Sequence, residues 1–427
     1  MRGYSYPRRI LPFAPTSLTG RGPVTFGLRA GQRVRGGYEL SGTEMSSNLR
    51  ANCIAALIVD TVRDEEVQPM KKIQFRVVPL FALACVWMAC GAKSRSPDEM
   101  TTPRFNHSAT LLLNGTVLLA GGETGTYTAE LYDPETNTFG SSLNMVSGRY
   151  LHTATLLADG SVLLAGGNNN GKAELFNPDS HSFRATGSMM SGRFLHTATL
   201  LPNGNVLVTG GIRVDQVVAT AELYDPATGI FTSTSSMLTQ RALHTATLLP
   251  DGNVLIAGGS SDTDTALASA ELYNPQTGTF TMTGAMGMER ADHTATLLAT
   301  GQVLVAGGLG FAGGFLNSAE LYDPATGSFR ATGTMTSARD LHTETLLSNG
   351  KVLLTGGYGP DGLGHIVTFS SAELYDPRAG SFTATNDMNT TRRLHTATRL
   401  PDGRVLLAGG LDATGTALTT AEVFVQP

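Results

Sequence analysis

Cysteine is scarce in this chain, and the few cysteines all lie near its start. The sequence of 427 residues holds three, at Cys53, Cys85 and Cys90, and none follows. A region without cysteine forms no disulfide and has no thiol chemistry. The part after residue 90 must therefore derive its stability and any function from other groups.

Charged residues are also sparse, at 15% of the sequence, and they are unevenly distributed. The net charge is −5, but residues 1–69 contain nine arginines, no lysine and six acidic residues, so the remainder carries −8. Because nucleic acids bind proteins through positive charge, we expect no nucleic-acid partner for the later region.

Several catalytic signatures are missing as well. The sequence has no glycine-rich phosphate loop, no HExxH pair and no nucleophile elbow. We therefore predict no catalytic residue, no metal site and no cofactor, and we do not expect an enzyme.

A fourteen-residue apolar run from Val77 to Cys90 is too short for a comfortable membrane span. It follows Lys71, Lys72 and Arg76, and a basic start before a short apolar run is typical of a secretory signal. We predict a signal peptide over residues 70–90. Residues 1–69 show neither a repeat nor a sustained period, and we interpret them as an extension upstream of a true start at residue 70.

The end of this signal resembles the lipobox of bacterial lipoproteins. A small residue precedes Cys90, although Trp87 stands where the motif usually has an aliphatic residue. The resemblance implies that Cys90 is lipidated, and Cys85 is a weaker second match. An ordinary signal cleaved near Ala89 or Ala92 is the alternative. We expect a lipoprotein of the cell envelope, in the outer membrane or on the cell surface, that touches the membrane through this anchor only, or alternatively a secreted protein.

The later region is organised around one stretch that occurs seven times. Its clearest copy covers residues 244–275, and every copy opens with a histidine. The spacings are 45, 44, 48, 49, 49 and 53 residues, and the histidines are His107, His152, His196, His244, His293, His342 and His395. A period of this size is typical of a repeat architecture.

Each copy contains four short strand-like pieces separated by turn residues. In the fourth copy they cover residues 244–249, 253–257, 270–273 and 279–284, bounded by Gly, Asn, Asp and Pro. Four short antiparallel strands per repeat match one propeller blade, whereas a helical solenoid needs longer segments. We predict an all-β fold over residues 91–427, a seven-bladed β-propeller of four-stranded antiparallel blades.

The copies resemble Kelch repeats. One feature is a double glycine after the second strand, at 121/122, 166/167, 210/211, 258/259, 307/308, 356/357 and 409/410. Another is an aromatic residue in the third strand, at Tyr132, Phe176, Tyr224, Tyr273, Tyr322, Tyr375 and Phe424. Where the family commonly has Trp in the fourth strand, this chain has Phe139, Phe183, Phe231, Phe280, Phe329 and Phe382. The resemblance implies a divergent, bacterial Kelch-type propeller.

The last copy lacks a fourth strand because the chain ends after its third. Met100 stands four residues before an arginine, as the methionine at the end of each fourth strand does. We therefore predict that an N-terminal outer strand, roughly residues 93–100, closes blade seven by pairing with residues 421–425.

Two charges recur in every copy. An arginine precedes each first strand, at Arg104, Arg149, Arg193, Arg241, Arg290, Arg339 and Arg392, and a glutamate opens each third strand, at Glu130, Glu174, Glu222, Glu271, Glu320, Glu373 and Glu422. The antiparallel path places both at similar depth, so we predict structural ion pairs beside the histidine. A catalytic role needs one asymmetric constellation rather than seven equal ones. A metal-binding ring of histidines requires their rings to converge.

Specificity must come from what differs between copies. The loops between second and third strands vary in length and lie on one face, which is where a rigid scaffold usually binds its ligand. The ligand-binding candidates are Tyr358, Asp361, His365 and Phe369 in the longest loop, and Arg213, Phe311 and Phe315 in others. Loops that merely cover the blade ends are the alternative.

Two further residues depart from the repeat in the first strands. Glu344 replaces an alanine and Arg399 replaces a leucine. An ion pair between them is one interpretation, and independent drift at solvated positions is the simpler one.

We predict a non-catalytic, monomeric binding module for a protein or a glycan. The alternative is a carbohydrate-active propeller enzyme, mutarotase-like or oxidase-like, with its site at the channel mouth. Oxidases that resemble galactose oxidase use copper and a tyrosine crosslinked to a cysteine, and the absence of cysteine after Cys90 argues against that chemistry here. An enzyme should have a pocket with convergent, unrepeated polar groups, whereas a binding module should have a broad face.

Overall fold

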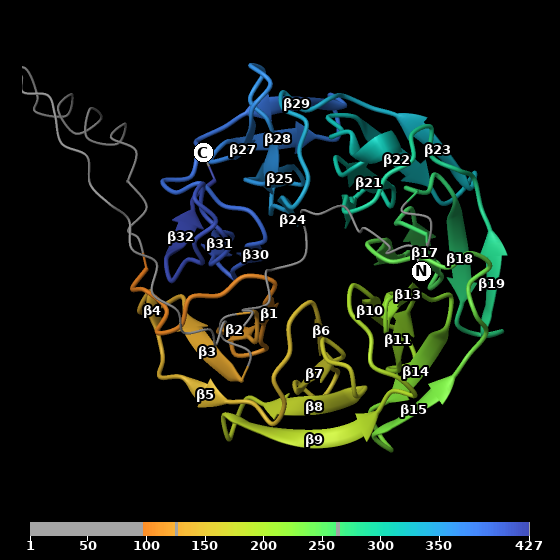
Figure 1. Cartoon of the computed structure of the whole chain (residues 1–427), viewed down its shortest axis with the longest axis vertical. Helices are drawn as coiled ribbons and strands as arrows, with labels where there is room; N and C mark the ends of the chain where they lie inside the picture. The colour runs from red at the N-terminus through yellow and green to blue at the C-terminus, as the bar shows by residue number, and fades with distance from the viewer. Residues whose placement is uncertain (1–96, 124–126, 262–264, 427) are drawn as a thin grey trace, which may run out of the picture. The chain divides into compact units, whose positions relative to one another are not determined.

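The computed structural model describes residues 97–123, 127–261 and 265–426. Its seven repeats form seven antiparallel sheets around a common axis, so the predicted seven-bladed β-propeller is confirmed (Figure 1). The first strand of each repeat lies nearest the axis and the fourth lies at the rim.

The strands of the first three blades follow the predicted order. Blade one contains β1 (Ser108–Leu111), β2 (Val117–Ala120), β3 (Thr128–Asp133), β4 (Thr138–Phe139) and β5 (Leu143–Asn144). Blade two contains β6 (Thr153–Leu156), β7 (Val162–Ala165), β8 (Lys172–Asn177) and β9 (Ser182–Ser188). Blade three contains β10 (Thr197–Leu200), β11 (Val206–Thr209), β14 (Ala221–Asp225) and β15 (Ile230–Ser233), with the loop hairpin β12 (Ile212–Arg213) and β13 (Gln216–Val217).

The remaining blades follow the same order. Blade four contains β16 (Thr245–Leu248), β17 (Val254–Ala257), β18 (Ala270–Asn274) and β19 (Thr279–Met282). Blade five contains β20 (Thr294–Leu297), β21 (Val303–Ala306), β22 (Ala319–Asp323) and β23 (Ser328–Ala331), with the short 3₁₀ turn η1 (Phe311–Gly313). Blade six contains β24 (Thr343–Leu346), β25 (Val352–Thr355), β28 (Ala372–Asp376) and β29 (Ser381–Ala384), and its loop hairpin is β26 (Tyr358–Pro360) and β27 (Ile366–Thr368). Blade seven contains β30 (Thr396–Arg399), β31 (Val405–Ala408) and β32 (Ala421–Phe424).

The second strand is the buried centre of each blade. In β17, all four residues are buried, because this strand lies between β16 and β18 and both of its faces meet neighbouring blades. An unbroken Val, Leu, Ile and Ala run is what such a strand requires. Each second strand therefore reads as continuously apolar instead of alternating.

The hydrophobic core is divided among the interfaces between blades. Seven clusters of buried side chains occur among the described residues, one for each pair of neighbouring blades. The Tyr and Phe of the third and fourth strands pack together, as with Tyr273 and Phe280, whose ring centroids are 4.8 Å apart. The Tyr273 hydroxyl also hydrogen-bonds Thr234 of the preceding blade, at 3.0 Å. The aromatic residues thus stabilise both a blade and its junction with the next.

The ring is closed by the segment just before the first repeat. The N–H of Met100 donates to the carbonyl of Thr419 at 2.9 Å, and the side chain is only 3% exposed, between blades seven and one. The N–H of Asp98 donates to the carbonyl of Asn137, which matches the bond from Gly187 to Gly229 in blade two. These residues follow the path of a fourth strand.

Two details of the closure differ from the prediction. Within the described residues blade seven has three paired strands, and the contact is with Thr419 rather than residues 421–425. The reason is directional: the methionine ends a fourth strand that runs antiparallel to the third, so it meets the beginning of the third strand. The part of the closing segment before residue 97 lies outside the described residues.

Candidate binding face at the channel mouth

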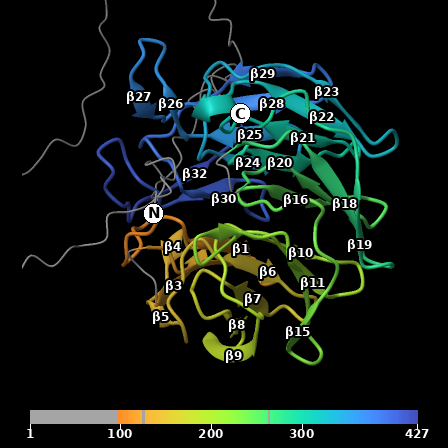
Figure 2. The same ribbon diagram turned by 45° about the vertical axis from the view of Figure 1, so that its right-hand side comes forward.

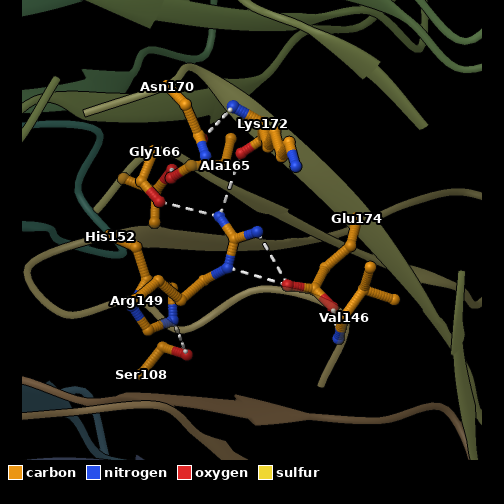
Figure 3. Close-up of polar contacts among 10 residues, drawn as sticks. Ser108, Val146, Arg149, His152, Ala165, Gly166, Asn170, Lys172 and Glu174 are labelled. Carbon is orange, nitrogen blue, oxygen red and sulfur yellow. Dashed lines mark hydrogen bonds and ion pairs between the residues drawn. The ribbon is translucent and has the colours of Figure 1, made fainter. Parts of the chain in front are cut away.

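The repeated arginine and glutamate form a buried ion pair in each blade. In blade two, Nη2 and Nε of Arg149 donate to one carboxylate oxygen of Glu174, at 2.7 and 2.9 Å (Figure 3). Nη1 of Arg149 donates to the carbonyls of Gly166 and Lys172, at 2.7 and 3.2 Å. The other oxygen of Glu174 accepts the N–H of Val146, at 2.7 Å. These bonds hold the connector before the first strand of blade two against the loop between the second and third strands of the same blade.

The pair recurs in every blade, with N to O distances of 2.6–2.9 Å, as Arg104–Glu130, Arg149–Glu174, Arg193–Glu222, Arg241–Glu271, Arg290–Glu320, Arg339–Glu373 and Arg392–Glu422. No arginine of the set is more than 1% exposed. Burial lowers the pKa of Arg241, and the charge of Glu271 partly offsets this. Because each charge is buried against its partner, the pairs are structural and neither member is presented to a ligand.

Each repeated histidine is hydrogen-bonded to the blade before it. Nε2 of His152 lies 2.9 Å from Oγ of Ser108 in blade one (Figure 3). The same bond occurs in the other six pairs, His107–Thr396, His196–Thr153, His244–Thr197, His293–Thr245, His342–Thr294 and His395–Thr343. Burial, reinforced by the charge of Arg104, lowers the pKa of His107 to about 3, so this ring is neutral at pH 7.

The histidines do not provide the metal-binding ring that the sequence left open. Each Nε2 is engaged with a hydroxyl, and no group of three or more His, Cys, Asp or Glu that could hold a metal occurs in the described part of the chain. The function of these histidines is to join neighbouring first strands.

The double glycines are explained by the same histidines. A Cβ on Gly258 would lie 2.5 Å from the carbonyl oxygen of Arg290 and 2.7 Å from Cε1 of His293. A Cβ on Gly259 would lie 2.8 Å from Cβ of His244. The glycine pair therefore fits between the histidines of two successive blades, and its φ angles of 61° and 95° also favour glycine.

The residue before each histidine has a left-handed backbone, with φ between 52° and 57°, although none is glycine: Asn106, Leu151, Leu195, Leu243, Asp292, Leu341 and Leu394. Their peptide groups link neighbouring blades, as where the N–H of Leu151 donates to the carbonyl of Asn106 at 3.0 Å. Around the axis six of them border an open depression of about 290 Å³, here called the mouth cavity, which is lined by Asn106, His107, Leu151, His152, Leu195, His196, Asp292, Leu341, His342, Leu394 and His395.

The variable loops lie around this cavity on one face, as predicted. In blades three to seven, the connector before the first strand forms a bridge with the residue after the double glycine, as between Phe194 and Ile212, and between Asp340 and Tyr358. We call this the loop face. The hairpin of β26 and β27 extends from it beyond the sheet of blade six (Figure 2).

Two of the predicted candidates meet on this face, together with a residue that the sequence did not suggest. The rings of Phe315 and Tyr358 lie edge to face, with centroids 6.1 Å apart. The guanidinium of Arg393 lies over the Tyr358 ring, 4.7 Å from its centroid, and donates to Oγ1 of Thr368. This stack joins blades five, six and seven.

The other candidates are dispersed. Phe369 lies against the buried Arg339, whose guanidinium carbon is 5.0 Å from the ring centroid. Asp361 and His365 pair with each other at the hairpin tip, at 2.9 Å. The carboxylate of Asp361 also caps its own turn, and the hydrogen bond from His365 lowers its pKa.

Arg213 is exposed in β12, and Phe311 begins η1. Among the candidates whose side chains the structure describes, it therefore groups Phe315 with Tyr358 and, separately, Asp361 with His365.

A second cluster, in blades one to three, was missed by sequence reasoning. The rings of Tyr150 and Phe194 lie 5.3 Å apart at 39°, and nearby Nδ2 of Asn106 donates to Oε1 of Glu123 at 2.8 Å. Burial raises the pKa of Glu123, and the hydrogen bond from Asn106 partly offsets this. The available signal was the residue directly after the repeated arginine, which is aromatic in these three blades only.

Glu344 and Arg399 do not form an ion pair. Arg399 is exposed and donates to the carbonyl of Leu346 at 3.3 Å. Neither carboxylate oxygen of Glu344 has a partner with hydrogen-bond geometry. Burial raises the pKa of Glu344 to about 8, and the hydroxyls of Thr294 and Thr296 partly offset the rise. The two residues are separate departures from the repeat.

The predicted lipidation site, Cys90, lies outside the described residues, as does the whole predicted signal over residues 70–90. Within the described part of the chain, no helix is long and apolar enough to cross a membrane.

Comparison with known proteins supports the fold. No protein-family model and no curated protein sequence matches the chain. Among solved structures, the chain is similar to a fungal alcohol oxidase of the AA5 family in complex with copper, with a TM-score of 0.65 and 17% identity over 79% of this chain and 77% of that one. It is also similar to YjhT, with a TM-score of 0.54 and 14% identity over 77% of this chain and 97% of that one. At such identities the likeness shows a common propeller fold and nothing further about activity.

Proposed function

We propose that this protein is a divergent Kelch-type propeller that acts as a non-catalytic binding module, with a protein or glycan ligand on the loop face. The double glycines and the paired Tyr and Phe rings support the Kelch assignment, since each has the same structural role in successive blades. The proposal for the ligand rests on how the polar side chains are divided between the scaffold and the loops.

The main support is a difference between repeated and unrepeated side chains. The repeated charged side chains pair with each other inside the blades, whereas unrepeated aromatic and charged side chains lie together on the loop face. The arginine and glutamate of each blade are buried against each other. On the loop face, Arg393 and Tyr358 form one partly exposed cluster, and Tyr150 and Phe194 form another. Aromatic rings beside hydrogen-bonding groups suit both a sugar ring and a peptide side chain.

The test is a screen of the full-length protein against a glycan array and a peptide library, followed by titration of the best ligand. We expect Tyr358→Ala or Tyr150→Ala to weaken binding at least tenfold. Glu135→Ala is the matched control, because Glu135 is exposed in a turn at the opposite ends of the blades. Unchanged binding in both loop-face variants would refute the location. Chemical change of the ligand, followed by mass spectrometry, would refute the non-catalytic assignment.

We also propose that the mature protein is anchored in the cell envelope through a lipid on Cys90. The support is the basic start, the short apolar run and the small residue before this cysteine. The test is the intact mass of protein extracted from membranes of a bacterial host, for the wild type and Cys90→Ala. A chain beginning at Cys90 with added acyl mass, absent from the variant, is expected. An unmodified chain would refute the anchor.

A further inference from the structure

The left-handed residues around the mouth cavity follow the repeat except at two positions. The left-handed residue before the histidine is leucine in five blades, Asn106 in blade one and Asp292 in blade five. Four of the leucines line the cavity and supply apolar surface between its polar groups. With a volume of about 290 Å³, it is at the lower end of the size of small-molecule sites.

Asp292 supplies the one negative charge of the cavity wall. The other ionisable groups among the lining residues are five histidines, and burial lowers the pKa of each, to about 3 for His107, His196 and His342. These rings are therefore uncharged at pH 7. The amide of Asn106 is engaged with Glu123. An otherwise uncharged wall with a single carboxylate favours a ligand with a single positive charge.

One oxygen of the Asp292 carboxylate also lacks a partner among the described residues. Its Oδ2 atom is buried without a hydrogen bond, and no ion pair among the described residues includes Asp292. Its backbone carbonyl also lacks the bond that links the equivalent residues of neighbouring blades: the N–H of Leu394 donates to the carbonyl of Leu341, but within the described residues the N–H of Leu341 does not donate to Asp292. One residue thus contributes a carboxylate oxygen and a carbonyl oxygen that accept no hydrogen bond from the described residues. A buried polar group in this state is stabilised by any ligand that donates to it.

We propose that the mouth cavity binds a primary ammonium group carried on a short apolar chain, with Asp292 as its counter-ion. An ammonium offers three donors, which suit the carboxylate and the carbonyl of Asp292. The leucines cover the methylene groups. The chemistry is shared by a free alkylamine and by the side chain of a lysine on a partner protein. The site is distinct from the one proposed for the outer loops, because none of the aromatic rings of Phe315, Tyr358, Tyr150 and Phe194 lines it.

The experiment is calorimetric titration of the full-length protein at pH 7 with n-butylammonium, n-butanol and butyrate. The three probes share an apolar chain and differ in head-group charge. We expect butylammonium to bind at least tenfold more tightly than butanol, and butyrate not to bind. Equal affinity for the ammonium and the alcohol, or no heat from butylammonium up to millimolar concentration, would overturn the proposal.

Two substitutions test the counter-ion without endangering the fold. Asp292→Leu and Asp292→Asn each install a residue that this fold already accepts at the same left-handed position, in five blades and in blade one. Both should abolish butylammonium binding while thermal unfolding stays close to wild type. Retention of wild-type affinity in Asp292→Asn would overturn the role of the charge. Tyr358→Ala is the control variant, and it should bind butylammonium as the wild type does even if it loses the loop-face ligand.

A further pair of probes identifies the source of the ammonium group. Binding of Nα-acetyl-lysine amide as tightly as butylammonium supports a lysine of a partner protein. Binding of butylammonium alone supports a free amine, because the peptide groups around the lysine then obstruct entry.

Discussion

The Nε2 atom of His107 lies 3.1 Å from the Oγ1 atom of Thr396, so the first blade is joined to the last by the hydrogen bond that joins every other pair of neighbours. The two residues are 289 positions apart in the sequence. This contact completes a circle of seven equivalent hydrogen bonds around the axis. The first strands of the first and last blades are therefore joined in the same way as those of any other two neighbouring blades.

The closing segment makes a quantitative prediction about Met100. If the closing segment completes blade seven as the fourth strands complete the other blades, Met100→Ala and Met286→Ala should lower the free energy of unfolding by similar amounts, about 2–5 kcal/mol each. Both side chains are buried, at 3% and 4% exposure. Chemical denaturation of the two variants measures this. A loss at Met100 that is far below the loss at Met286 would show that the closure is not equivalent to the other junctions.

The ion pairs predict a large effect of removing one partner. Glu271→Ala should lower the free energy of unfolding by about 3–5 kcal/mol, because Arg241 remains buried without its counter-charge. The N–H groups of Leu238 and Thr239 also lose their acceptor. Thermal unfolding checks this, with Glu135→Ala as an exposed control that should be neutral. Unfolding of Glu271→Ala at the wild-type temperature would refute the network.

The double glycines predict a steric effect beyond backbone strain. Gly258→Ala should be several-fold more costly than Gly204→Ala, although both glycines have positive φ, at 61° and 89°. At Gly204 no atom lies within 4 Å of the new Cβ, so the cost is the conformational penalty alone, about 1–2 kcal/mol. At Gly258 the new atom meets Arg290 and His293. Equal unfolding temperatures for the two variants would refute this explanation.

Glu344 predicts a pH-dependent gain in stability. Its pKa is raised to about 8 by burial, from 4.5, so the folded state holds the proton more tightly than the unfolded state does. Ionisation of this carboxyl therefore does not lower the free energy of unfolding below about pH 4.5. The loss of stability grows as the pH rises and is complete above about pH 8. Glu344→Ala restores the alanine found at this position in all six other first strands, and it should raise the unfolding temperature more at pH 9 than at pH 5. The same shift at both values would argue against a buried, protonated carboxyl.

The propeller itself could be predicted because its determinants are local and repeated. The spacing of His244 and His293 sets the length of a blade, and the turn residues after Leu248 and Tyr273 set its strands. The Arg241–Glu271 pair could also be predicted from the sequence, because antiparallel strands of known order bring both residues to the same depth. Seven copies of one pattern make each of these inferences reinforce the others.

The candidate functional residues were harder to predict from the sequence, because their arrangement depends on contacts between blades. The variable loops suggested Tyr358 and Phe315, but only the folded chain brings Arg393 over the Tyr358 ring, from a connector in another blade. Phe369 looked like a ligand contact and instead lies against the buried Arg339.

The sequence by itself determined the blade, its period and the pairs within it, since these rest on short-range geometry and on a pattern repeated seven times. Only the tertiary structure decided that Asp292 is the one carboxylate among the residues that line the mouth cavity. A single aspartate in place of leucine is an ordinary substitution along the chain. It becomes a site because ring closure surrounds it with neutral side chains from five other blades and leaves its charge without a partner.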